Sequence, residues 1–187
     1  MMKSEIMTSP RGRAHASLTS ARSGATALAL LASPVGELRL IVADDGLAAI
    51  LFPDHHGAAV SPVPTAVAPD HPVLRLAQQQ LAEYFAGTRD QFTIPLSPRG
   101  TPFQHRVWGA LATIPYAETR SYLEIARQIG SPTAMRAVGA ANGKNPLSIV
   151  VPCHRVIGAN GTLTGFGGGL DAKRWLLDHE QRYRSWA

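Results

Sequence analysis

The chain of 187 residues is long enough for one large domain or two small ones. Hydrophobic residues make up 45% of it and charged residues 17%, so most of the chain is able to build a packed core. No apolar stretch approaches the roughly 18 residues needed to cross a bilayer, and we therefore expect a soluble protein.

The net charge of +5 is distributed unevenly along the chain. Residues 1–24 carry +3, residues 25–98 carry −4 and residues 99–187 carry +6. A basic C-terminal half beside an acidic middle fits the binding of a polyanion. A solubilising surface charge would give the same balance, so charge alone leaves both interpretations open.

Cys153 is the only cysteine in the sequence. It excludes an internal disulfide and a cysteine-rich zinc site, and it favours a reducing compartment, for which we expect the cytoplasm. A lone cysteine is by default a small buried hydrophobe. Any functional role must therefore come from its neighbours.

Residues 1–24 are rich in Ser, Thr, Arg and Ala and show no apolar periodicity. This composition predicts a disordered basic tail. The segment is also arginine-rich and poor in acids, as transit peptides are, and its early methionines leave a later start site open. We exclude it from the predicted fold.

A β pattern followed by one helix predicts a small N-terminal α/β domain over residues 25–96. Asp70 is expected to cap the helix and Gly87 to end it, and Phe92–Leu96 is expected to return as a short strand. His55 and His56 lie in the preceding loop without an acidic or cysteine partner at ligand spacing, which favours a solvated loop over a metal site. The expected strands are Ala27–Ala32, Glu37–Ala43 and Leu47–Phe52.

The proline-rich segment Pro95–Pro102 is the best candidate for a domain boundary, and residues 97–187 beyond it are predicted to be mainly helical. The second and third of its expected helices are joined by a short glycine-containing turn, which is typical of a helix-turn-helix but also of ordinary helical hairpins. The overall class is α+β. The expected helices run from Pro102, capped by Thr101, to Ile114, and over Tyr122–Ile129, Ala134–Ala141 and Asp171–Arg182.

Cys153 lies between Pro152 and His154, where an imidazole is available to take the thiol proton and leave a nucleophilic thiolate. Adjacent residues of an extended chain point to opposite sides, so this pairing needs a turn or a bridging water. A histidine base also needs an acceptor that orients its ring. Glu180, on the last predicted helix, is the best candidate by residue type.

The run Pro152-Cys153-His154-Arg155-Val156, preceded by Asn145-Pro146, resembles the active-site signature of the O6-alkylguanine–DNA alkyltransferases, the methylated-DNA–protein-cysteine methyltransferases. The resemblance extends from about Thr101 to Glu180. Residues 26–96 resemble the small β-rich, ribonuclease-H-like domain of that family only in outline. The motifs that carry the similarity include Thr101-Pro102-Phe103-Gln104, Glu118-Thr119-Arg120-Ser121-Tyr122, Arg136-Ala137-Val138-Gly139 and Leu176-Leu177-Xaa-His179-Glu180.

The resemblance implies DNA repair by direct reversal, in which Cys153 irreversibly accepts one alkyl group from O6-alkylguanine. It implies a single-turnover methyltransferase that needs no cofactor and no metal, with O4-alkylthymine left open as a second substrate. His154 would prepare the thiolate through a water, with Glu180 orienting the imidazole. Tyr122 would donate a proton to the leaving guanine, and Asn145 would tie the helix-turn-helix to the active-site segment.

The resemblance also implies that double-stranded DNA is bound in the minor groove without sequence preference, by a monomer; cooperative binding is left open. The damaged base must leave the stack, and the planar cation of Arg136 is suited to fill the gap. The small residues of the third predicted helix would let it approach the DNA closely. The DNA-binding residues implied are Arg136, Ala134, Ala137, Ala141, Thr119, Ser121 and Arg155. The base pocket implied is formed by Asn142, Val156, Phe166 and Gly167, the last through its backbone N–H.

Two residues depart from the family pattern without removing a reacting group. Phe166 stands where many members have tyrosine, which keeps base stacking but loses a hydroxyl. Ala117 replaces a common glycine in the turn before Glu118. The zinc site of some members is absent in its cysteine-bearing form, because Cys153 has no second cysteine to join it.

Three alternative functions were weighed against alkyl transfer. A DNA-binding relative without transfer activity would lack the cysteine. A helix-turn-helix regulator would present a polar recognition helix and usually a dimerisation element, and neither is evident. A Cys–His hydrolase would need water to resolve a thioester, and no signature of that class is present.

Overall fold

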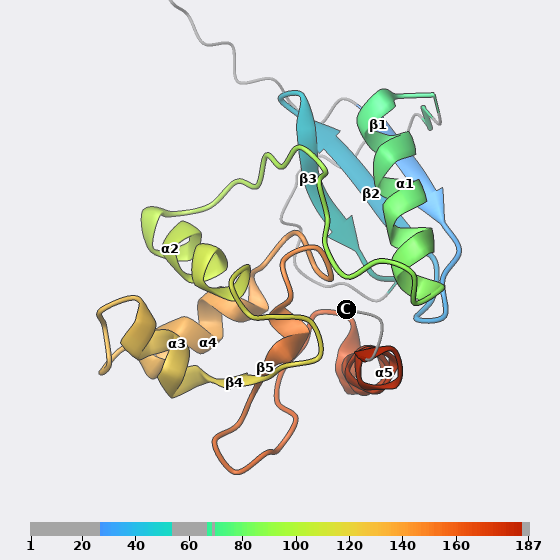
Figure 1. Ribbon diagram of the computed structural model, residues 1–187. Coiled ribbons are helices and arrows are strands. Elements are labelled where there is room, and N and C mark those ends of the chain that lie inside the picture. Colours follow the sequence, from blue (N-terminus) through green and yellow to red (C-terminus); the bar gives the residue numbers. More distant parts are fainter. Residues whose placement is uncertain (1–26, 54–66, 69, 185–187) are drawn as a thin grey trace, which may run out of the picture.

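The computed structural model describes residues 27–53, 67–68 and 70–184 (Figure 1). The predicted tail over residues 1–24 and the His55-His56 pair lie outside the described residues. The elements are β1 (Ala27–Leu31), β2 (Leu38–Ala43), β3 (Gly46–Leu51), α1 (Pro72–Phe85), α2 (Pro102–Leu111), β4 (Arg120–Ser121), α3 (Tyr122–Gln128), α4 (Met135–Gly143), the 3-10 turn η1 (Cys153–Arg155), β5 (Val156–Ile157) and α5 (Gly169–Arg182).

The three predicted N-terminal strands are confirmed as an antiparallel sheet of order β1-β2-β3. The turn between β2 and β3 does not use its glycine for a positive φ, as the Asp44-Asp45-Gly46 sequence would suggest. Asp44 and Asp45, not Gly46, have positive φ values, of 50° and 64°. Aspartate tolerates this region because its short side chain bonds locally. Gly46 is needed for space instead, since a Cβ there would lie 2.9 Å from the Leu96 backbone and the Ser97 side chain.

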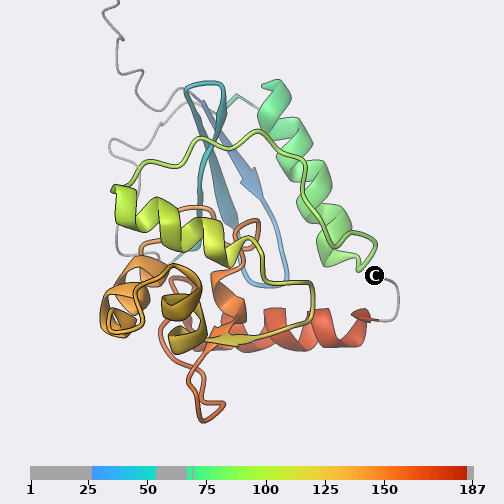
Figure 2. The same ribbon diagram turned by 60° about the vertical axis from the view of Figure 1, so that its left-hand side comes forward.

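Helix α1 packs along one face of this sheet, as both views show (Figures 1 and 2). Its N-cap is His71 rather than the predicted Asp70, because the His71 Nδ1 atom accepts the Val73 N–H at 3.3 Å and Pro72 follows at the first helical position. Leu74 and Leu81 are fully buried against the sheet. Burial of this apolar face holds the helix in place.

Helices α2, α3 and α4 pack against one another, and α5 lies apart from them, below α1 in Figure 2. The predicted cap at Thr101 is confirmed, and Ser121 begins α3 in the same way; each forms a capping box with the third helical residue. Helix α2 ends at Leu111, earlier than the predicted Ile114, because residues 112–114 continue as turns. The helix-turn-helix formed by α3 and α4 stays a prediction.

The N-terminal sheet is joined to the C-terminal helices by backbone hydrogen bonds from β3. Leu47 N–H donates to Pro95 O at 2.8 Å, and Ile50 N–H donates to Pro146 O at 2.8 Å. The predicted strand Phe92–Leu96 is reduced to an isolated bridge between Leu47 and Leu96. As a result, β3 directly supports the segment that leads to Cys153. In the described part of the chain, no helix has the length and apolar character required to cross a membrane.

Candidate active site

Cys153 begins the short turn η1, so that it does not continue an extended strand. The strict alternation of side chains along an extended strand, which would direct adjacent residues to opposite sides, therefore does not apply to Cys153 and His154. The Cys153 side chain is buried, with 3% of the residue exposed, and His154 is completely buried. The cysteine and the imidazole therefore share one desolvated environment.

Glu180, on α5, is the centre of a buried hydrogen-bond network. Its Oε1 lies 2.7 Å from His154 Nε2 and accepts the Tyr84 hydroxyl at 2.9 Å. The Arg155 guanidinium donates to both carboxylate oxygens, each at 2.9 Å, and the Ala117 N–H donates to Oε2 at 3.0 Å. Burial alone would raise the pKa of Glu180, but His154 and Arg155 outweigh it and hold the pKa well below its usual value.

His154 is oriented by this carboxylate through Nε2, and its other ring nitrogen, Nδ1, is buried without a partner among the described residues. Burial lowers the pKa of His154, against the opposing effect of Glu180. At neutral pH the imidazole is therefore uncharged. With the proton on Nε2 toward Glu180, Nδ1 is left as an acceptor suited to receive a proton.

Burial of the Cys153 sulfur disfavours a thiolate, whereas several neighbouring groups stabilise one. Burial raises the pKa of the Cys153 thiol, while hydrogen bonding by Asn145 and Ser148 and the charge of Lys173 lower it. Ser148 Oγ lies 3.8 Å from the sulfur. Asn145 also donates to Val151 O at 2.8 Å, which fixes the segment that follows α4 next to the one that precedes the cysteine.

Lys173 is a charged residue at this site that the sequence interpretation missed. It is fully buried on α5, and its ammonium donates to Val156 O at 2.6 Å and to Thr164 O at 2.7 Å. Burial lowers the pKa of Lys173 to about 8, and Cys153 raises it. One sequence feature could have identified Lys173 as buried. It lies on the same helix face as Leu176 and Glu180, at the spacing of a buried stripe.

A cavity of about 670 Å³ lies between helices α3 and α4 and the Gly-rich loop, residues 158–168; we call it the α3–α4 pocket. The Tyr122 hydroxyl accepts a hydrogen bond from Thr164 Oγ1 at 3.1 Å, which leaves the tyrosine proton free to be donated. Cys153 does not line this cavity. The lining residues are Ser121, Tyr122, Leu123, Met135, Arg136, Gly139, Gly143, Gly158, Ala159, Thr164, Gly165, Phe166 and Gly167.

Two family models match the chain in succession. Residues 27–98 match the ribonuclease-like domain of 6-O-methylguanine DNA methyltransferase, and residues 102–182 match its DNA-binding domain. The chain belongs to the 6-O-methylguanine DNA methyltransferase family. The resemblance inferred from the motifs around Cys153 is thereby confirmed, and so is the predicted α+β class.

Members of this methyltransferase family are similar to the chain both in sequence and in structure. The chain is 49% identical over 152 residues to a methylated-DNA–protein-cysteine methyltransferase of Methanosarcina acetivorans, covering 81% of this chain and 96% of that protein. It is 65% identical over 107 residues to one of Mycolicibacterium paratuberculosis, covering 57% of this chain and 65% of that protein. A crystal structure of Mycobacterium tuberculosis OGT in complex with DNA is 48% identical, covers 84% of this chain and 94% of that chain, and superposes with a TM-score of 0.76.

The structure brings the implied methyltransferase residues together in two groups. Cys153, His154, Glu180 and Asn145 are buried around the network. Tyr122, Arg136, Ser121, Phe166 and Gly167 line the α3–α4 pocket. Ala137 is exposed on α4, and Ala134 and Thr119 are half-buried near it.

Four implied residues lie elsewhere than expected. Arg155 is buried, and its guanidinium binds Glu180 and the Ile114 carbonyl, so its side chain does not face DNA. Ala141 is also buried, and its carbonyl accepts the Trp108 indole N–H at 2.9 Å. Asn142 and Val156 are likewise buried and do not line the α3–α4 pocket. The burial of Arg155 and Ala141 gives no support to their implied DNA contacts, and the implied places of Asn142 and Val156 in the base pocket stay predictions.

Ala117 has a backbone conformation that favours glycine, the residue common at this position in the family. The residue is buried and has a φ of 58°, a left-handed conformation that costs an L side chain roughly 1–2 kcal/mol. Its N–H is held by Glu180 Oε2 at 3.0 Å. The strained backbone at this turn places the Ala117 N–H where it donates to the Glu180 carboxylate.

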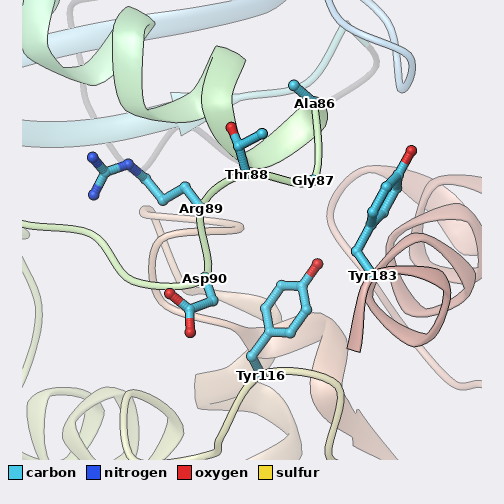
Figure 3. Close-up of a pocket in the computed structure, with 7 residues that line it drawn as sticks. All are labelled: Ala86, Gly87, Thr88, Arg89, Asp90, Tyr116 and Tyr183. Carbon is cyan, nitrogen blue, oxygen red and sulfur yellow. The ribbon is translucent and has the colours of Figure 1, made fainter. Parts of the chain in front are cut away.

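Two further cavities are present, and Cys153 lines neither of them. One, of about 340 Å³, is enclosed by the end of α1, Tyr116 and Tyr183 (Figure 3). Burial and the charge of Glu180 raise the pKa of Tyr116 to about 12, so its hydroxyl stays neutral. The other, of about 500 Å³, lies between residues 90–96 and 149–152. Within the described ranges, no group of three His, Cys, Asp or Glu side chains is placed to hold a metal ion.

Proposed function

We propose that this protein repairs O6-alkylguanine in double-stranded DNA by moving the alkyl group onto Cys153. The observation that carries the proposal is the 2.7 Å hydrogen bond between His154 Nε2 and Glu180 Oε1, directly beside the only cysteine of the chain. A carboxylate that orients an imidazole next to a thiol is the arrangement that prepares a sulfur nucleophile. Because the nucleophile must stay reduced, we also propose a cytoplasmic location.

The reaction is a displacement at the alkyl carbon. The thiol proton passes to His154 Nδ1 through a water, and the Cys153 sulfur then forms a bond to the carbon as the bond between carbon and guanine O6 breaks. The electron pair of that bond stays on the guanine. The guanine anion takes the proton of the Tyr122 hydroxyl, and the proton released by the thiol restores the tyrosine. The products are a thioether and an unmodified guanine.

The buried sulfur sets a condition on this reaction. Cys153 does not line the α3–α4 pocket, so the side chains between them must shift before the alkyl carbon reaches the sulfur. Phe166 and Gly167 border the place where an extruded guanine would enter. A stacking ring and a backbone N–H there suit the face and the O6 edge of the base.

Binding to the minor groove is proposed from the exposed start of α4. Arg136 and Ala137 are exposed, and Met135 is 47% exposed beside them. Small residues permit a close approach to the DNA backbone, while the arginine fills the gap left by the extruded base. These contacts carry no base-edge recognition, so we expect binding without sequence preference; the family resemblance further implies that the protein binds as a monomer.

Intact-mass measurement after mixing with an O6-methylguanine duplex tests the transfer. We expect a gain of one methyl group, located on the Cys153 peptide, because a thioether is inert and the chain has no second cysteine. Cys153→Ala should bind the duplex but gain no mass. Transfer of several methyl groups per protein would refute the single-use reaction, and a methylated Cys153→Ala would show that another residue is the acceptor.

Replacing Arg136 with alanine separates base extrusion from chemistry. We expect the rate on duplex DNA to fall about tenfold or more, because the cost of an unstacked base is a few kcal/mol. Reaction with a free O6-alkylguanine base should be nearly unchanged. Arg75→Ala on α1, also an exposed arginine, is the control and should leave both rates as they are. Equal losses on duplex and free base would remove the gap-filling role from Arg136.

A further inference from the structure

Phe52 belongs to the N-terminal domain, yet its ring contacts the wall of the α3–α4 pocket. It directly follows β3 and is buried, with 3% of the residue exposed. Its ring meets that of Phe166 edge to face, with the centroids 5.3 Å apart and an interplanar angle of 72°. Phe166 in turn lines the α3–α4 pocket. One aromatic contact therefore links the sheet to the pocket.

Gly168 provides a second contact to the same ring. A Cβ built on Gly168 would lie 2.5 Å from Phe52 Cδ1, so any side chain there would collide with the ring. The Gly168 backbone has a φ of −90°, which any residue adopts, so no conformational requirement explains this glycine. Close packing of the loop against Phe52 does explain it.

Phe166 also contacts the catalytic imidazole. Its ring lies edge to face with that of His154, with the centroids 6.4 Å apart and an interplanar angle of 78°. Three rings from three parts of the chain are thus arranged in series: Phe52 after β3, Phe166 in the Gly-rich loop and His154 in η1. A loop rich in glycine has little stiffness of its own, so its aromatic side chain takes its position from what it packs against.

We propose that Phe52 is a positioning residue for the α3–α4 pocket: it holds Phe166, the ring on which the extruded base stacks, and seats the Gly-rich loop through Gly168. The proposal rests on the proposed alkyl transfer and adds a role for the N-terminal domain in that reaction. Edge-to-face packing fixes the orientation of Phe166 as well as its place. The N-terminal domain then acts on the chemistry without touching the substrate.

The kinetic test compares single-turnover rates of Phe52→Ala, Phe166→Ala and the double variant with a free O6-alkylguanine base. We expect Phe52→Ala to slow the reaction about tenfold or more, because small displacements of a positioning group cost one to two orders of magnitude. In the Phe166→Ala background the same substitution should change the rate less than about twofold, since its target is gone. Losses that simply multiply would overturn the proposal.

A matched control separates positioning from general loss of stability. Leu74→Ala also removes a buried side chain of the N-terminal domain, from α1. It should lower the melting temperature while leaving the rate of the folded protein unchanged. If Phe52→Ala and Leu74→Ala have the same rate as the unmodified protein, Phe52 has no positioning role.

Gly168→Ala tests the same contact by adding a group to the loop instead of removing the Phe52 ring. The added methyl group should collide with the Phe52 ring and slow the reaction, whereas in Phe52→Ala it should cause no further loss. Amide hydrogen exchange gives a readout that does not depend on activity: residues 165–168 should exchange faster in Phe52→Ala. Unchanged exchange would overturn the inference even if alkyl transfer is intact. Failure of the unmodified protein to gain mass would instead refute the proposed function.

Discussion

Replacing Glu180 with alanine is expected to lower the free energy of unfolding by about 3–5 kcal/mol and to abolish alkyl transfer. The carboxylate is fully buried and binds the Arg155 guanidinium, so its removal leaves a buried cation whose remaining contacts among the described residues are the Ile114 carbonyl and the Tyr116 ring. It also removes the only hydrogen-bond partner that His154 Nε2 has among the described residues. Urea unfolding and a single-turnover assay measure the two effects.

The exposed ion pair between Glu118 and Arg120 provides the control for Glu180. Their side chains are each 40% exposed and lie 3.0 Å apart. Because such pairs contribute about 0–1 kcal/mol, Glu118→Ala should unfold at nearly the urea concentration of the unmodified protein. A loss of stability in Glu180→Ala no larger than that of Glu118→Ala would show that the buried network does not hold this part of the fold together.

The lowered pKa of Glu180 also predicts how the stability of the fold depends on pH. Its pKa is lower in the folded state than in the unfolded chain, so its contribution is fully present above the unfolded value of about 4.3 and is lost as the pH falls through the folded value. His154 adds to this loss, because its lowered pKa means that the unfolded chain binds a proton first as the pH falls below about 6.5. Glu180→Gln should therefore lose less stability than the unmodified protein between about pH 5 and pH 3.

The motif around Cys153 predicts the candidate reacting residues, because the chemistry demands particular residue types there. Residue type and the presence of a late helix singled out Glu180 as the partner of His154, and the structure places them 2.7 Å apart. For Arg155 the resemblance implied DNA binding, whereas the structure pairs its side chain with Glu180, and the reason for the difference is physical. A sequence shows a positive charge but not the carboxylate that neutralises it, and Glu180 binds Arg155 across 25 residues.

Three strands and the cap of α2 followed from local signals, whereas the cap of α1 and the contacts between distant segments did not. Alternation and turn residues identify β2 and β3, and Thr101 with Gln104 identifies the start of α2. The pairing of β3 with residues 95–97 and 146–147 depends on tertiary packing, and the predicted strand Phe92–Leu96 is reduced to an isolated bridge. The contact of Phe52 with the Gly-rich loop was hidden for the same reason, since 114 positions separate Phe52 from Phe166.

Replacing Lys173 with methionine is expected to raise the pKa of the Cys153 thiol. Lys173 is buried, and no carboxylate of the described residues lies within ion-pair distance of its ammonium, so the thiolate is the anion that balances its charge. Removing a nearby cation disfavours the anion, so the midpoint of the rate against pH should move upward. At neutral pH the reaction with a free O6-alkylguanine base should then slow about tenfold.

The other charged groups around Cys153 keep their places in this variant. His154 adjoins the cysteine in η1, and Arg155 and Glu180 neutralise one another within the buried network. Lys173→Met also leaves Val156 O and Thr164 O without their ammonium donor, which lowers stability. Lower stability alone does not move the pH midpoint of the folded protein. The pH profile therefore distinguishes the charge of Lys173 from its hydrogen bonds.

Because Cys153 is the only cysteine, ultraviolet absorbance of the thiolate measures its pKa directly, with Cys153→Ser as the blank. Lys144→Met, which removes an exposed lysine, is the control and should titrate like the unmodified protein. Identical midpoints in Lys173→Met and Lys144→Met would show that the buried lysine does not stabilise the nucleophile and serves only to fasten the Gly-rich loop.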